Sequence, residues 1–204
     1  MRTVPRGGAE RFMPSVGGRD NGAVGNEHEP VKTGGTGVAD ATGTVVRDED
    51  LTVLAEQLGR PPRGVVAVAA RCVCGRPLVV RTAPRLEDGT PFPTTYYLTE
   101  PQAVAAVSTL EASGLMKELT ARLTEDEELA AAYRRAHEAY LADREELGRV
   151  AEIAGISAGG MPTRVKCLHV LVAHALAAGP GVNPVGDEVL ELLRDVWRPD
   201  RCTC

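Results

Sequence analysis

Residues 64–82, GVVAVAARCVCGRPLVVRT, decide the fold class of this chain. Two short apolar runs rich in β-branched residues flank a turn that contains Cys74 and Gly75, and this pattern predicts an antiparallel hairpin. A third run, Thr94–Leu98, follows the Asp88–Gly89 turn signal and predicts another strand. Because three short strands need a helix on one face to be stable, the pattern predicts a small antiparallel three-stranded sheet covered by helices.

Helical periodicity surrounds the predicted strands. One segment before the hairpin and four segments after it predict about five helices, which begin near Asp48, Thr99, Thr124, Thr163 and Pro184. Thr124 and Glu127 have the spacing of a capping box, which predicts the start of a long helix that runs to about Ala154. The fold class predicted from the sequence is therefore α+β.

The two ends of the chain differ from its middle in composition. Residues 1–46 hold ten of the 22 glycines and few large apolar side chains. Such a segment cannot bury enough apolar surface to offset the entropy of ordering, so a disordered Gly-rich N-terminal extension is predicted. Residues 48–198 are expected to form a single domain, and residues 199–204 are expected to form a flexible tail with a Cys-x-Cys pair.

Charge and hydropathy exclude several classes of partner. The formal net charge is −5, and residues 48–198 carry sixteen Lys/Arg against twenty-two Asp/Glu. An acidic domain repels a phosphate backbone, so nucleic acid is not expected as a partner. No stretch reaches the ~20 apolar residues of a membrane helix and no secretory leader is visible, so a cytoplasmic location without a membrane partner is expected.

Cysteine and histidine occur in two segments that the fold could bring together. Cys72-x-Cys74 lies where the first strand meets the turn, and Cys167-x-His169 lies near the start of a predicted helix. Thiolate and imidazole are the ligands that zinc prefers, although the spacing differs from that of paired C-x-x-C knuckles. The two segments predict a zinc site; the alternative is that the cysteines are small core residues.

Helix geometry limits what the second segment can supply. On a straight helix, His169 points about 140–160° away from Cys167, so one ligand, or two if the first turn is distorted, would reach an ion. The terminal Cys202-x-Cys204 is interpreted as a flexible thiol pair, with recruitment of a metal as the alternative.

Two predicted helix starts form a second candidate site. Arg164 and Lys166 lie at the start of the helix predicted from Thr163, and Asn183 is the predicted N-cap of the next helix, with Asp187 in its first turn. Cations and free backbone amides at helix N-termini favour phosphate or carboxylate. An enzyme or binding domain for a small anionic ligand is therefore the alternative function, and plain helix capping is the alternative to that.

Several segments resemble the bacterial family known as domain of unknown function 501, namely RGVVAVAARC, PFPT, RVKCLH and NPVGD. The resemblance covers about Leu51 to Leu193 and brings no established activity. It implies cysteines at the positions of Cys72, residue 100 and Cys167. This sequence has Glu100 in place of the middle cysteine, which weakens an iron–sulfur cluster and leaves zinc with Glu100 or Cys74 as a further ligand.

The leading hypothesis from the sequence is a non-catalytic accessory protein with a structural zinc site. Its candidate ligands are Cys72, Cys74, Glu100, Cys167 and His169. We expect such a protein to act through a protein partner, for which the predicted helix from Thr124 to Ala154 is the candidate surface.

Overall fold

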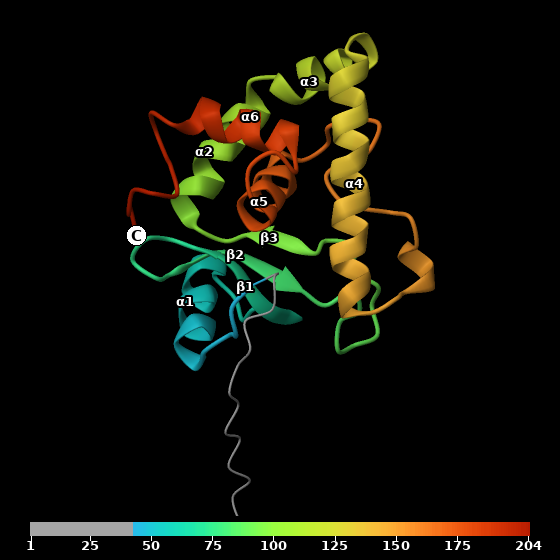
Figure 1. Cartoon of the computed structure of the whole chain (residues 1–204). Coiled ribbons are helices and arrows are strands. Elements are labelled where there is room, and N and C mark those ends of the chain that lie inside the picture. Colours follow the sequence, from blue (N-terminus) through green and yellow to red (C-terminus); the bar gives the residue numbers. More distant parts are fainter. Residues whose placement is uncertain (1–42) are drawn as a thin grey trace, which may run out of the picture. The chain divides into compact units, whose positions relative to one another are not determined.

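The structure is a computed structural model that describes residues 43–204 (Figure 1). Residues 1–42, which contain most of the predicted disordered extension, lie outside the described residues. Within the described part, the chain forms one three-stranded antiparallel sheet and six α-helices. The α+β class predicted from the sequence is confirmed.

The sheet is built around the predicted hairpin. Its strands β1 (Val65–Arg71), β2 (Pro77–Thr82) and β3 (Tyr96–Leu98) lie in the order β1-β2-β3 and pair antiparallel. The turn between β1 and β2 is closed by Cys72, whose N–H donates to the Arg76 carbonyl at 2.9 Å and whose carbonyl accepts from the Gly75 N–H at 2.8 Å. Gly75 adopts a φ of 90°, which favours glycine at this position.

Both faces of the sheet are covered. Helix α1 (Asp48–Leu58) packs on one face and α5 (Leu168–Ala178) packs on the other (Figure 1), so every residue of the central strand β2 is buried. Thr44 extends the sheet beyond β1, because its backbone exchanges two hydrogen bonds with Val68 at 2.9 and 3.0 Å. The described structure therefore includes residues 43–46 of the segment that the sequence assigned to the extension.

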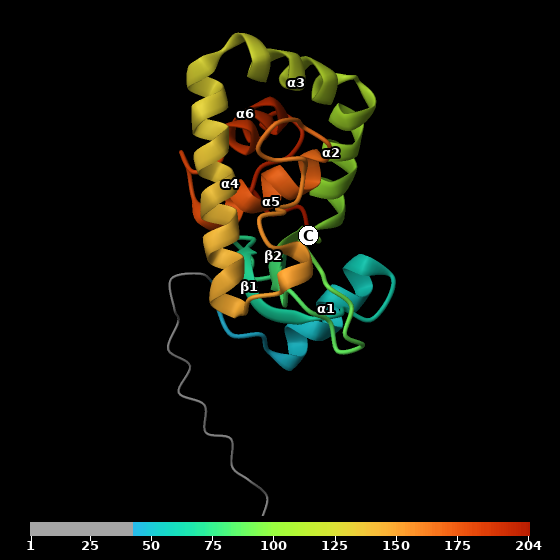
Figure 2. The same cartoon turned by 90° about the vertical axis from the view of Figure 1, so that its right-hand side faces the viewer.

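The remaining helices surround α5. Helices α2 (Pro101–Ala112), α3 (Leu115–Glu125) and α4 (Glu127–Leu147) form an arch around α5 and α6 (Pro184–Leu193), as Figure 2 shows. The close approach of α5 and α6 depends on Gly186, where an added Cβ would lie 2.2 Å from the carbonyl oxygen of Leu171. Within the described residues, no helix combines the length and the apolar character that crossing a bilayer requires.

The capping box predicted at Thr124 is wrong. Helix α4 is capped by Asp126, whose carboxylate accepts a hydrogen bond from the Leu129 N–H at 2.9 Å. The helix ends at Leu147 instead of Ala154, because Gly148 leaves the helical conformation. Arg144 near the end of this helix is buried, and its side chain donates to the carbonyl of Ile153 at 2.8 Å.

The helix start predicted at Thr163 is also wrong. Helix α5 begins at Leu168, with Cys167 as the N-cap. The residues before it form a loop whose backbone donors bind elsewhere: the Lys166 N–H donates to the Gly159 carbonyl at 2.7 Å, and the Val165 N–H donates to Thr120 Oγ1 at 2.9 Å. These bonds hold the loop in a non-helical conformation.

Candidate functional site

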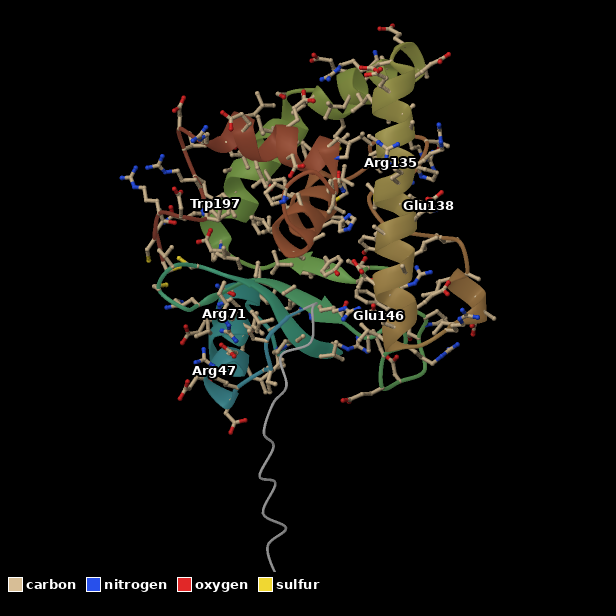
Figure 3. All side chains as sticks on the ribbon, in the orientation of Figure 1. Arg47, Arg71, Arg135, Glu138, Glu146 and Trp197 are labelled. Atoms are coloured by element: carbon tan, nitrogen blue, oxygen red, sulfur yellow. The ribbon has the colours of Figure 1, made fainter. Side chains whose placement is uncertain are left out.

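Four cysteines from two distant parts of the chain meet at one corner of the fold. Cys72 and Cys74 come from the turn after β1, and Cys202 and Cys204 come from the segment that follows α6. Their sulfur atoms all lie within 4.8 Å of one another. Figure 1 shows the C-terminus beside the β1–β2 turn, and Figure 3 shows sulfur atoms gathered there. We call this group the four-cysteine corner.

The backbone of the turn directs N–H groups at the sulfur atoms. The Cys74 N–H donates to the sulfur of Cys72, and the Arg76 N–H donates to the sulfur of Cys74. The second of these bonds lowers the pKa of the exposed Cys74 thiol to about 7. Burial raises the pKa of Cys72. The turn thus stabilises a thiolate at Cys74.

An ion pair between Arg71 and Asp50 stabilises the β1–β2 turn. Arg71 donates to both carboxylate oxygens of Asp50, at 2.7 and 2.8 Å, and to the carbonyl of Gly75 at 2.9 Å. These hydrogen bonds from Arg71 lower the pKa of the Asp50 carboxyl, so the aspartate stays ionised. The bidentate pair therefore connects α1 to the turn that carries Cys72 and Cys74.

Contacts on both sides of Cys202 anchor the C-terminal segment. Trp197 (labelled in Figure 3) is buried in the core, and its backbone N–H donates to the Leu193 carbonyl at 2.8 Å. Gln102 Nε2 at the start of α2 donates to the Thr203 carbonyl at 2.8 Å. The segment that the sequence described as a flexible tail is therefore docked on the domain in this structure.

The predicted combination of Cys72 and Cys74 with Cys167 and His169 does not form. The structure places these residues in two separate groups, and the second group contains Glu111, Cys167 and His169. Glu111 Oε1 lies 3.1 Å from His169 Nδ1, and the Cys167 sulfur lies 3.9 Å from the same nitrogen. We call this group the thiol–imidazole site.

Hydrogen bonds define the protonation of His169. Its Nε2 lies 3.2 Å from the Val104 carbonyl, which can only accept. Nε2 also lies 3.2 Å from Ser108 Oγ, whose own proton is donated to the same carbonyl at 2.8 Å, so Nε2 carries a proton. Nδ1 faces the Glu111 carboxylate and carries one as well. The Cys167 sulfur and Glu111 raise the pKa of His169 to about 9, and the side chain is an imidazolium at neutral pH.

Glu100 caps a helix in this structure. The side chain is 2% exposed, and its two oxygens accept the N–H groups of Gln102 at 3.1 Å and Ala103 at 2.6 Å. Pro101 at the first helical position completes the start of α2. Glu100, at the position where the family resemblance implies a cysteine, therefore belongs to neither of the two groups that could hold a metal.

The predicted anion-binding residues have other roles or lie apart from a helix start. Asn183 is fully buried and caps α6, with Oδ1 accepting from the Gly186 N–H at 2.9 Å and Nδ2 donating to His174 Nδ1 at 3.1 Å. Asp187 accepts from the N–H of Gly181 at 2.8 Å. The exposed Arg164 and Lys166 precede α5 instead of forming its first turn.

Sequence reasoning missed two features of these sites. Cys202 and Cys204 were not paired with the hairpin cysteines, although the signal was present: Arg-Cys-x-Cys occurs at Arg71–Cys74 and again at Arg201–Cys204. Glu111 carried no local signal, because its partners Cys167 and His169 are brought to it only by the packing of α5 on α2.

Comparison with known proteins gives a family without an activity. Residues 68–191 match the family described as "Protein of unknown function (DUF501)". No curated protein and no solved structure matches the chain. The matched region includes the whole thiol–imidazole site and the hairpin half of the four-cysteine corner, whereas Cys202 and Cys204 lie beyond it. Since the match spans more than half of the sequence, this chain belongs to the DUF501 family.

Proposed function

We propose that the protein binds one Zn²⁺ through Cys72, Cys74, Cys202 and Cys204, and that this zinc has a structural role. The proposal is carried by the convergence of four sulfur atoms within 4.8 Å of one another. A tetrahedral zinc with Zn–S bonds of about 2.3 Å requires sulfur atoms about 3.8 Å apart, and the corner reaches that arrangement with small adjustments.

The exposure of the cysteines favours a metal over simple core packing. Cys72 is buried, but Cys74, Cys202 and Cys204 are exposed, so they do not fill a hydrophobic core. The N–H groups directed at Cys72 and Cys74 stabilise thiolates, which are the form that zinc binds. Four thiolates complete the coordination of zinc and leave no position for a substrate, and for this reason we assign the ion a structural role.

The consequence for the fold is a connection between the two ends of the described domain. Zinc would join the β1–β2 turn to the segment after α6, a link between parts of the chain that are far apart in sequence. The protein partner expected from the sequence stays a prediction. The face of α4 considered for it carries Arg135 and Glu138 on its outer side (Figure 3), and both are exposed.

The test is the metal content of untagged protein purified under reducing conditions. We expect about one zinc per chain by elemental mass spectrometry, and loss of that zinc in the double variant Cys202→Ser/Cys204→Ser. The matched control is Cys167→Ser, which removes a thiol from the other group and should keep the metal. Zinc-free wild-type protein, or zinc that is lost with Cys167 and kept by the double variant, would overturn the proposal.

A further inference from the structure

A large cavity opens beside the edge strand β3. Its volume is about 740 Å³, which is in the range of small-molecule sites. The thiol–imidazole site contributes Cys167 and His169 to its wall. The rest of the wall is mainly apolar and includes Leu58, Tyr96, Tyr97, Pro101, Val104 and Val170. Among the described residues, no Asp, Glu, Lys or Arg lines the cavity, so it suits an uncharged, apolar ligand.

The position of Cys167 suits a nucleophile. It is the N-cap of α5 and is partly exposed, and a helix N-terminus stabilises a negative charge on sulfur. The His169 imidazolium lies 3.9 Å from the sulfur, measured to Nδ1, and provides the counter-charge. Glu111 fixes this arrangement, because Oε1 accepts both from His169 Nδ1 at 3.1 Å and from the Leu168 N–H at 2.6 Å.

The same helix start can receive a carbonyl oxygen. The first N–H groups of a helix have no acceptor within the helix. Glu111 accepts a hydrogen bond from the Leu168 N–H, and the side chain of Cys167 does not cap the helix. The next two residues, His169 and Val170, line the cavity. Because the N–H groups of a first helical turn point out of the helix start, those of His169 and Val170 are the candidate donors to an acyl carbonyl next to the Cys167 sulfur.

The Cys167 thiol lies beside the His169 imidazole, near backbone N–H groups at the start of α5, and at the wall of an apolar cavity. From this arrangement we infer that Cys167 is a nucleophile that accepts an apolar acyl group from an ester or thioester. The thiolate attacks the carbonyl carbon and forms a C–S bond. The bond from that carbon to the leaving oxygen or sulfur breaks, and His169 gives its Nδ1 proton to the leaving group. Neutral His169 then takes a proton from a water molecule, whose oxygen attacks the carbonyl carbon of the acyl-thioester. The C–S bond breaks, the carboxylic acid leaves, and the Cys167 thiolate lies again beside the protonated His169.

A metal at this site is the competing explanation, and the hydrogen bonds argue against it. A metal-bound imidazole needs a lone pair on one ring nitrogen. Both ring nitrogens of His169 face acceptors, Glu111 on one side and Val104 on the other. The inference is independent of the four-cysteine corner, because none of its cysteines is among the residues that line this cavity.

The experiment uses the full chain and two acyl donors of the same length. Protein is mixed with p-nitrophenyl octanoate or with octanoyl-coenzyme A, and intact-mass and peptide mass spectrometry locate the adduct. We expect one octanoyl group on Cys167 from at least one donor, and the arm that reacts identifies an ester or a thioester as the carrier. p-Nitrophenyl acetate should react at least ~10-fold more slowly, because a two-carbon chain leaves the cavity unfilled.

Three variants test the separate roles of the thiol, the imidazole and the carboxylate. Cys167→Ser should form no adduct while it unfolds at the temperature of the wild type. His169→Gln should acylate ~10²-fold more slowly, the usual range for loss of a positioned acid–base group. Glu111→Gln, which removes a positioning residue, should move the upper limb of the pH profile for Cys167 acylation to lower pH, because the Glu111 carboxylate helps to raise the pKa of His169.

Several outcomes would overturn the inference. They are an adduct on Cys74 alone, no adduct from any donor, or zinc that is lost in the Cys167→Ser variant. Zinc content measured on the same samples separates this result from the proposed function, because acylation of Cys167 requires no metal at the four-cysteine corner.

Discussion

The two cysteine groups of this protein differ in the source of their counter-charge. The four-cysteine corner brings together four thiols, and the group that could hold a metal there contains no histidine or carboxylate. The thiol–imidazole site has a single thiol, with the His169 imidazolium 3.9 Å away, held in turn by Glu111. A thiolate among thiols needs a cation from solution, whereas a thiolate beside an imidazolium already has one. The same residue type therefore indicates metal binding in one place and nucleophilic chemistry in the other.

The two groups also differ in how the fold assembles them. The thiol–imidazole site is made by two helices that pack directly on each other, α2 and α5, and it lies inside the region that matches the family. The four-cysteine corner joins a hairpin turn to a terminal segment, and half of its cysteines lie outside that region. The first group should therefore survive changes at the C-terminus, while the second should depend on them.

Removing zinc gives the largest expected effect and separates the two groups most clearly. Zinc at the corner would close a loop of more than 100 residues, and closure of such a loop is worth about 3–5 kcal/mol in the chain-entropy description. We expect chelated protein to lose a comparable part of its free energy of unfolding and to unfold ~10 °C lower in calorimetry. The double variant Cys202→Ser/Cys204→Ser should unfold at the same lowered temperature with or without chelator.

Cys167→Ser is the matched control for metal removal. It should unfold near the wild-type temperature in the presence of zinc and show the same loss after chelation. The comparison fails if chelation leaves the wild-type unfolding temperature unchanged, or if Cys167→Ser and the double variant respond to the chelator in the same way.

A smaller effect is expected at Glu100, the position where the family resemblance implied a cysteine ligand. Glu100→Ala removes the acceptor of the Gln102 and Ala103 N–H groups and should cost about 1–2 kcal/mol, as loss of a helix N-cap does. Zinc content should not change, because Glu100 belongs to neither cysteine group. Denaturant unfolding and elemental analysis of the same sample measure both quantities.

Glu100→Gln is the control for the cap. It keeps one carbonyl oxygen as an acceptor in the same place, so it should recover part of the lost free energy. A stability unchanged in Glu100→Ala would contradict the capping role. Zinc lost from both variants would show that Glu100 acts as a ligand and that the four-cysteine corner is incomplete without it.

The sequence predicted what is local and failed where partners come from elsewhere in the chain. The hairpin around Cys74 and Gly75 was found correctly because its strands and its turn are adjacent in sequence. The helix start at Thr163 was wrong because the loop before α5 is held by bonds to Gly159 and to Thr120, neither of which belongs to the local helical pattern.

The candidate sites followed the same rule. Cys72 and Cys74 were expected to meet Cys167, whereas the structure brings them to Cys202 and Cys204. No periodicity or spacing rule connects a hairpin turn with a terminal segment across more than half of the chain. Asn183 was recognised as a helix N-cap, and its burial against His174, which excludes an anion, could be seen only after α5 and α6 were packed together.

The smallest expected effect is a pH dependence that belongs to the thiol–imidazole site alone. Partners in the folded protein raise the pKa of His169 from about 6.5 to about 9. Its contribution to the free energy of unfolding is therefore complete below pH 6.5 and is lost as the pH rises through 9. Because the side chain is 24% exposed, screening by solvent reduces the contribution to about 1 kcal/mol.

The measurement is the difference in free energy of unfolding between wild type and His169→Gln at pH 6, 8 and 10. We expect wild type to be more stable by about 1 kcal/mol at pH 6 and the difference to approach zero at pH 10. The four-cysteine corner does not distort this result, because it is present in both proteins and its own pH dependence cancels in the difference. A difference that stays constant over this range would mean that His169 is neutral in the folded state, and the contrast between a thiol with its own counter-charge and thiols that need a metal would no longer hold.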